Sequence, residues 1–188
     1  RSIGYEPGTI LIEPEGKNTG PAILAASLYE LEKNSEAILL VTPTDQIISS
    51  KEKFHEAICK GMSEIQKGQI ITFGIKPTFP ETGYGYIKSK RELESKGVVY
   101  SEIVDFLEKP SKHLAEKFIK DKRYSWNSGM FVFKASTIIS EVEKFYPEII
   151  SCCKKALETT IEDLDFKRIE EKVFSHCPPY SIDVAVME

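Results

Sequence analysis

The chain has 188 residues and a formal net charge of −4, with 41% hydrophobic and 29% charged residues. This composition is typical of an ordinary globular protein with a sizeable core, and it excludes a disordered chain. Acidic and basic residues are interspersed without a basic stripe, so we expect no nucleic-acid partner.

Helices alternate with short apolar strands along the first third of the chain, which is the pattern of an α/β domain. Residues 10–12 are predicted to end a strand, and Asn18 or Thr19 is predicted to cap a helix that ends near residue 34. The apolar run 37–41 is typical of a strand buried on both faces.

The rest of the chain continues this alternation, and we expect residues 1–188 to form part of a single domain. Pro110 is predicted to stop a strand, and Ser111 to cap the helix that follows it. The remaining predicted elements are a helix over 51–67, strands over 70–75, 86–88, 100–108 and 130–133, a helix over 111–120, and a helical region from 135 with breaks near 147 and 178.

The four cysteines give no metal-ligand or redox spacing, so we expect buried or idle thiols in a reducing compartment. No stretch reaches the ~20 apolar residues of a membrane span, and no signal peptide opens the chain. These features predict a cytoplasmic protein that does not contact a membrane.

Asp45 directly follows the predicted buried strand 37–41. Ligands in open α/β sheets gather beyond the carboxyl ends of the strands. A carboxylate at that point suits a hard divalent cation that bridges nucleotide phosphates. The alternative is an aspartate that only forms a turn or caps a helix, which is common after strands.

Two glycines, Gly83 and Gly85, lead into the predicted strand 86–88 with tyrosines beside them. Glycines let the backbone approach a ligand closely and present amide N–H groups to hydroxyl or phosphate oxygens, and the tyrosines could lie against a sugar ring. A turn that merely needs glycine is the alternative.

Glu108 and Lys109 end another predicted strand, and Asn127 precedes Ser128 and Gly129. A carboxylate accepts hydrogen bonds from sugar hydroxyls, a lysine supplies a charge for a phosphate, and an amide can read hydroxyl geometry. The alternatives are a solvated Glu-Lys pair and an Asn-Ser-Gly turn.

Six segments occur in an order and approximate spacing that resemble one family, the bacterial mannose-1-phosphate guanylyltransferases, whose members often carry a fused mannose-6-phosphate isomerase domain. The first is similar to E-P-x-G-R-N-T-A-P-A, the third to F-G-I followed by P-E-T-G-Y-G-Y-I. The segments are 13–22, 41–46, 73–75 with 80–87, 106–110, 126–131 and 181–188.

This resemblance implies a nucleotide-diphospho-sugar transferase fold, which is a Rossmann-like α/β fold with a mixed, mostly parallel sheet flanked by helices. It also implies formation of GDP-mannose and pyrophosphate from GTP and mannose 1-phosphate, with Mg²⁺ as cofactor. It leaves open whether the protein forms a homodimer. Asp45 would bind the metal and Lys109 the sugar phosphate, both as catalytic residues. The other implied contacts are Gly85, Glu108 and Asn127 with the mannose, and Asn18 and Thr19 with the nucleotide.

The sequence also departs from the family pattern. It lacks the glycine-rich loop that opens the family and the D-x-G-S-W aspartate that follows the last segment, so we expect a fragment truncated at both ends and inactive alone. Lys17, Gly20 and Gln46 stand where the family has arginine, alanine and histidine. The alternatives are a UTP- or dTTP-dependent sugar-1-phosphate nucleotidyltransferase, a non-catalytic binding module, and a parent whose isomerase activity lies in a separate domain.

Overall fold

The computed structural model describes residue 4 and residues 8–93, 98–164 and 166–187. The chain divides into two compact units, which are described separately: 1–37 with 138–186, and 38–137 with 187–188. Glu188, the last residue of the sixth family-like segment, lies outside the described residues. The expected single domain stays a prediction.

The first unit packs helices around a small sheet. Leu24 and Leu28 of the first helix are buried, as are Ile149, Ile150 and Cys153 of the helix that contacts it. The helices are α1 (Thr19–Lys33), α4 (Ala135–Phe145), α5 (Pro147–Glu158), α6 (Glu171–Phe174) and α7 (Ile182–Met187), and the strands are β1 (Ile10–Ile12), β7 (Ile161–Asp163) and β8 (Phe166–Arg168).

The ends of these helices follow the sequence signals. Asn18 is the N-cap of α1, and its Oδ1 accepts the Thr19 N–H at 2.8 Å. Pro147 begins α5, as expected for a residue that lacks an N–H. The strands β7 and β8 replace part of the predicted helical region, because β8 pairs in parallel with β1, far away in sequence.

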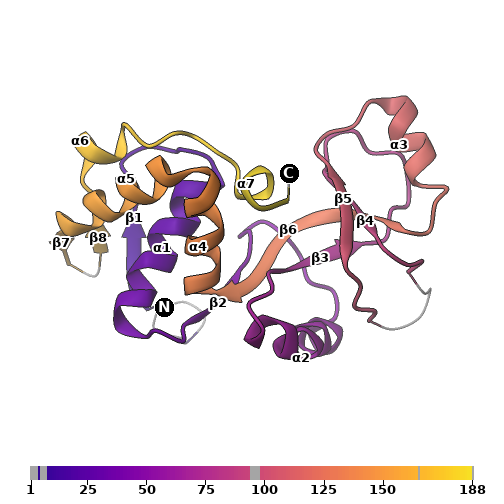
Figure 1. Cartoon of the computed structure of the whole chain (residues 1–188), viewed down its shortest axis with the longest axis horizontal. Coiled ribbons are helices and arrows are strands. Elements are labelled where there is room, and N and C mark those ends of the chain that lie inside the picture. Colours follow the sequence, from indigo (N-terminus) through magenta and orange to yellow (C-terminus); the bar gives the residue numbers. More distant parts are fainter. Residues whose placement is uncertain (1–3, 5–7, 94–97, 165, 188) are drawn as a thin grey trace. The chain divides into compact units, whose positions relative to one another are not determined.

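The second unit is built on a five-stranded sheet with β6 at its centre (Figure 1). β6 pairs antiparallel with three strands, and the fifth strand pairs with β4. The strands are β2 (Ile38–Val41), β3 (Ile71–Ile75), β4 (Tyr86–Ser89), β5 (Ile103–Leu107) and β6 (Tyr124–Lys134), and the helices are α2 (Lys51–Gln66) and α3 (Lys112–Phe118).

Two helices cover parts of this sheet. In α2, Phe54 packs against Phe73 of β3, with ring centroids 5.5 Å apart. In α3, the buried Ala115 packs with Tyr86 and Trp126. The predicted cap of α3 is confirmed, because the Ser111 hydroxyl accepts the Leu114 N–H.

The expected α/β class, with mixed sheets flanked by helices, is confirmed, and the balance of strand directions differs from the expectation. Among the described strands, β1–β8 is the parallel pair and the other five pairs are antiparallel. The reason is that β2, β3 and β4 all lie against one long strand that runs opposite to them. The apolar run 37–41 does contain β2, but its predicted burial on both faces is wrong, because Ile38, Leu39 and Val41 are half-buried and Leu40 is 44% exposed.

The central strand changes partners halfway along one edge. Trp126 pairs with Tyr86 of β4, and Phe131 pairs with Val41 of β2, while β3 follows the other edge of β6. We call residues 127–130 the pairing break. On the β3 edge the register shifts between Thr72 and Gly74, so β6 bulges there.

Gly129 lies in this bulge with φ of 69°, a left-handed conformation that favours glycine. The sequence left a turn at this Asn-Ser-Gly as an alternative and predicted a strand only from residue 130. The segment is instead a bulge within a strand of 11 residues.

No helix in the described part of the chain is both long and apolar enough to cross a membrane.

Candidate functional site

The pairing break is where two loops of the second unit attach to β6. The Asn127 N–H donates to the Gly85 carbonyl at 2.8 Å, just before β4 begins. The Gln46 side chain donates from Nε2 to the Ser128 carbonyl at 2.6 Å, in the loop that follows β2. Gln46, which stands where the family has histidine, therefore holds the loop that carries Asp45.

Glu108 lies directly against Gly85. Because Tyr86 pairs with Leu107, Gly85 and Glu108 are neighbours across the β4–β5 ladder. A Cβ placed on Gly85 would lie 2.5 Å from Glu108 Oε2 and 2.8 Å from Phe106 Cε2. A side chain at position 85 would therefore force Glu108 and the Phe106 ring to move.

The sugar-side residues predicted from the sequence share one face of the sheet. Tyr86 is paired with both Leu107 and Trp126, so these three side chains point to one face. Neighbouring residues point to the opposite face because side chains alternate along a strand. Gly85, Glu108 and Asn127 therefore lie together on the face opposite Trp126.

Asn127 has a structural role in the bulge. Its Oδ1 accepts the Gly129 N–H at 3.3 Å and lies 3.1 Å from the Thr72 hydroxyl. The Ser128 hydroxyl accepts the Met130 N–H at 3.2 Å. These bonds satisfy backbone groups that the bulge removes from the ladder, which is a frequent use of Asn and Ser side chains.

Lys109 has φ of 47°, a left-handed conformation that costs a non-glycine residue roughly 1–2 kcal/mol. Such conformations cluster at functional sites. Its Nζ is 3.8 Å from Glu108 Oε1, and the lysine side chain is 66% exposed. The ammonium is thus close to the carboxylate and accessible to an anionic ligand. The alternative interpretation, a solvated Glu-Lys pair without a ligand, predicts the same exposure.

Asp45 is exposed in the loop after β2. The described residues contain no group of three or more His, Cys, Asp or Glu placed to hold a metal ion. A lone carboxylate still fits Mg²⁺ as one ligand, because Mg²⁺ commonly keeps several waters and takes its other ligands from substrate phosphates.

Asn18 and Thr19 belong to the first unit, at the start of α1. The Asn18 Oδ1 accepts the Thr19 N–H, and the Thr19 hydroxyl accepts the Ile182 N–H at 3.0 Å. Both side chains therefore stabilise the fold locally, and their predicted contact with a nucleotide stays a prediction.

Two departures from the family pattern have local explanations in this unit. A Cβ on Gly20 would lie 2.6 Å from the Tyr180 carbonyl oxygen, so alanine would not fit without movement. Lys17 donates to the Ser175 carbonyl at 2.7 Å and pairs with Glu15 at 3.1 Å. These contacts need a single ammonium and not the two-pronged guanidinium of arginine.

The sequence did not single out Thr72, because a threonine in a strand carries no functional signal. The suggestion that the tyrosines lie against a sugar stays a prediction for Tyr84, which is 49% exposed. Tyr86 is fully buried. The Tyr84 ring packs edge-on against Trp126 with centroids 5.4 Å apart, on the face away from Glu108.

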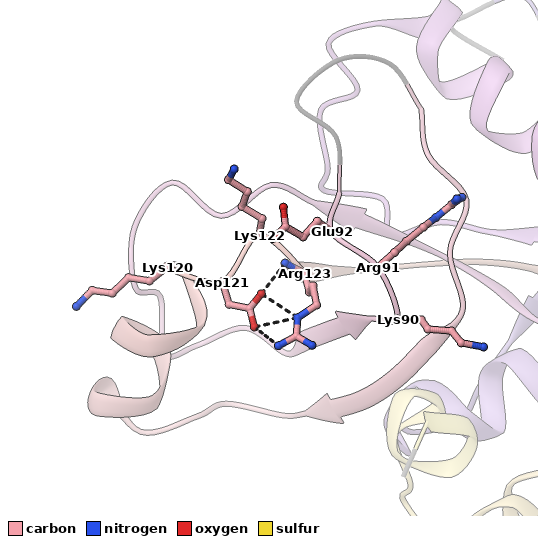
Figure 2. A pocket seen from close by; sticks show the side chains of 7 residues that line it. All are labelled: Lys90, Arg91, Glu92, Lys120, Asp121, Lys122 and Arg123. Atoms are coloured by element: carbon pink, nitrogen blue, oxygen red, sulfur yellow. Dashed lines mark hydrogen bonds and ion pairs between the residues drawn. The ribbon is translucent and has the colours of Figure 1, made fainter.

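A broad hollow of about 610 Å³ lies at the other end of β4 from Gly85 (Figure 2). Arg123 binds Asp121 there through two nitrogens, which holds the pKa of the Asp121 carboxyl below its usual value of 3.8. The hollow contains none of the predicted site residues. Its lining is Lys90, Arg91, Glu92 and residues 120–123.

Glu13, which follows β1, is the other ionisable group of interest in the first unit. Its Oε1 is buried without a hydrogen-bond partner in the described part of the chain. Burial raises the pKa of the Glu13 carboxyl above its usual value of 4.5.

The sequence of the chain matches the model of one known protein family. The family model described as "Nucleotidyl transferase" matches residues 4–172. The chain belongs to the nucleotidyl transferase family. The match of this family model extends over both compact units.

Among the curated nucleotidyl transferase relatives, the xanthan biosynthesis protein XanB of Xanthomonas campestris pv. campestris (strain B100) is 41% identical over 188 residues, covering 100% of this chain and 39% of the relative. The mannose-1-phosphate guanylyltransferase of Salmonella montevideo is 41% identical over 191 residues, covering 100% of this chain and 40% of the relative. The chain thus spans about two fifths of the length of these proteins.

A solved structure extends the comparison to three dimensions. The crystal structure of mannose-6-phosphate isomerase from Helicobacter pylori superposes with a TM-score of 0.82 at 35% identity. The match covers 94% of this chain and 67% of that one. This likeness confirms the fold.

Proposed function

We propose that the full-length protein transfers the guanylyl group of GTP to mannose 1-phosphate, forming GDP-mannose and pyrophosphate. The observation that carries this proposal is the meeting of three residues on one face of the sheet beside the pairing break: Gly85 just before β4, Glu108 just after β5, and Asn127 in β6. The relative from Salmonella montevideo, named mannose-1-phosphate guanylyltransferase, supports the choice of substrates.

In this reaction a phosphate oxygen of mannose 1-phosphate attacks the α-phosphorus of GTP. A new P–O bond forms, the bond to the β-phosphate breaks, and pyrophosphate leaves with its electron pair. The attacking oxygen is already anionic near neutral pH, so no strong general base is required. Catalysis then depends on alignment and on neutralising charge.

Each predicted residue has a chemical role in such alignment. Glu108 accepts hydrogen bonds from mannose hydroxyls, and the backbone N–H of Gly85 donates to one of the sugar oxygens. The Lys109 ammonium binds the sugar phosphate as a point charge. Asp45 would hold Mg²⁺, which neutralises phosphate charge when it is bound. Asn18 and Thr19 are proposed to contact the nucleotide. The formation of a homodimer stays a prediction.

The test is a substrate panel on the full-length protein. Four nucleoside triphosphates are combined with the 1-phosphates of mannose, glucose and N-acetylglucosamine, and pyrophosphate release is measured. The highest kcat/KM is expected for GTP with mannose 1-phosphate. A preference for UTP or dTTP with glucose 1-phosphate would assign a different nucleotidyltransferase, and no release with any pair would favour a non-catalytic module.

Isomerisation of mannose 6-phosphate is a second candidate, because the Helicobacter pylori protein is named for that activity. None of the described residues forms an isomerase-like cluster of metal ligands in this chain. If the full-length protein converts mannose 6-phosphate to fructose 6-phosphate, we expect Lys109→Ala to leave that rate unchanged while it impairs nucleotidyl transfer. Equal loss of both activities would contradict separate sites.

A further inference from the structure

The side-chain oxygen of Asn127 contacts two hydrogen-bond donors of the bulge. The Gly129 N–H lies 3.3 Å from Asn127 Oδ1, and the Thr72 hydroxyl lies 3.1 Å from the same atom. The Thr72 hydroxyl is also 3.0 Å from the Met130 carbonyl oxygen. All four residues border the bulge of β6 against β3.

The Gly129 N–H decides which end of the amide faces the bulge. The oxygen and nitrogen of an asparagine side chain are assigned from their hydrogen-bond partners. A backbone N–H can only donate, so the atom opposite Gly129 has to be the oxygen. The Thr72 hydroxyl has one proton and two oxygen acceptors in reach, so Asn127 Oδ1 and the Met130 carbonyl share this proton.

We propose that Thr72 is a positioning residue of the sugar site. With Oδ1 held in the bulge by Thr72 and Gly129, Asn127 meets the mannose through Nδ2, as a hydrogen-bond donor. This inference rests on the proposed function and specifies how the same site reads its sugar.

The assignment divides the polar contacts between two side chains. The carboxylate of Glu108 can only accept hydrogen bonds, so it contacts sugar O–H groups. Asn127, turned as described, donates to a sugar oxygen. From the sequence alone, the sugar contact of Asn127 could be made by either the oxygen or the nitrogen of its side-chain amide.

A purely structural role for Thr72 is the competing explanation, because its hydroxyl also satisfies the Met130 carbonyl in the bulge. That role predicts a loss of thermal stability without a selective effect on the sugar substrate. The positioning role predicts a change in KM for mannose 1-phosphate in particular.

Thr72→Val removes the hydroxyl at nearly constant shape, and Thr72→Ser keeps it. In the full-length protein, we expect Thr72→Val to raise KM for mannose 1-phosphate on the order of 3- to 10-fold, the range of one hydrogen bond. The KM for GTP and the kcat at saturating sugar phosphate should stay within about twofold, and Thr72→Ser should resemble the wild type.

Thr159→Val is the matched control. The Thr159 hydroxyl also donates to a backbone carbonyl, that of Lys155 at 3.4 Å, but it lies at the end of α5 in the first unit. We expect no change in any kinetic constant for this variant. A Thr72→Val protein with unchanged KM for mannose 1-phosphate, or a Thr72→Ser protein as impaired as Thr72→Val, would overturn the positioning role.

Asn127→Asp tests the donor role even if Thr72→Val does not fold. Aspartate keeps an acceptor for Gly129 and Thr72 but has no donor when ionised. We expect a folded protein with KM for mannose 1-phosphate raised at least 10-fold, in low and in high salt. Wild-type KM in this variant, or recovery in high salt as expected for simple charge repulsion, would overturn the donor assignment.

Hydrogen exchange of the Gly129 amide separates this inference from the proposed function, because it needs no substrate. We expect this amide to be protected in the wild type and in Thr72→Ser, and to exchange several-fold faster in Thr72→Val. Equal exchange in all three would refute positioning. If the wild type does not use mannose 1-phosphate as a substrate but shows this exchange pattern, only the proposed sugar substrate is refuted.

Discussion

Glu108 occupies the space that a side chain at position 85 would need, because a Cβ on Gly85 would lie 2.5 Å from Glu108 Oε2. The absence of a side chain at position 85, just before β4, therefore allows the Glu108 carboxylate, just after β5, to lie against the backbone there. This contact joins two of the predicted sugar-binding residues, and Asn127 joins them through its N–H bond to the Gly85 carbonyl at 2.8 Å.

Gly85→Ala should therefore displace Glu108 and the Phe106 ring. Overpacking of this kind costs about 1–3 kcal/mol, so the free energy of unfolding should fall by that amount. The KM for mannose 1-phosphate should rise, because Glu108 loses its position. Denaturant unfolding and steady-state kinetics measure the two effects. Gly16→Ala is the control, since a Cβ there meets no atom within 4 Å.

Lys109→Ala should impair the use of mannose 1-phosphate selectively. Loss of one charge-assisted hydrogen bond corresponds to roughly 1.5–3 kcal/mol in kcat/KM for that substrate. Lys112→Ala, at the start of α3, is a control for removing an exposed positive charge nearby. An unchanged kcat/KM for mannose 1-phosphate in the Lys109 variant would reject its assigned role.

Asp45→Asn should raise the Mg²⁺ concentration needed for half-maximal activity, since the amide is a weaker ligand for a hard cation than the carboxylate. Chelation with EDTA should abolish wild-type activity. Asp105→Asn, on exposed β5, is the control and should leave the Mg²⁺ requirement unchanged. The same Mg²⁺ dependence in the Asp45 variant and the wild type would exclude Asp45 as a metal ligand.

The short segments that carry chemistry were easier to predict than the sheet that brings them together. Asp45, Gly85, Glu108 and Asn127 were each proposed as site residues from their place at a strand end or beside glycine. The bulge that places Asn127 was not, because Asn-Ser-Gly is equally suited to a turn. Thr72 was missed because its partner lies 55 residues away, and local patterns do not report such contacts.

Glu13 should make stability depend on pH. Burial raises the pKa of its carboxyl in the folded protein above 4.5, so the folded state holds the proton more tightly than the unfolded state. The stabilising contribution of protonated Glu13 is therefore present below pH 4.5 and is lost as pH rises through the folded pKa. Glu13→Gln should raise Tm at pH 7 and leave it nearly unchanged below pH 4.5. An equal shift in Tm at both pH values would contradict this.

The four cysteines should differ in reactivity toward iodoacetamide. Cys59 is exposed, whereas Cys153 and Cys177 are buried. Burial raises the pKa of the Cys152 thiol to about 12, and the Cys153 thiol and burial raise the pKa of Cys177, so little thiolate is available. Mass spectrometry of the native protein should show rapid labelling of Cys59 alone, and equal labelling of Cys152 would contradict the prediction.

The most direct measurement is an NMR titration of the folded protein with mannose 1-phosphate, followed through the backbone amides. Gly85, Lys109 and Asn127 should show the largest saturable shifts, because the sugar phosphate is assigned to the face of the sheet beside the pairing break. Shifts confined to the hollow lined by Lys120 and Lys122, with these three amides unmoved, would contradict the site.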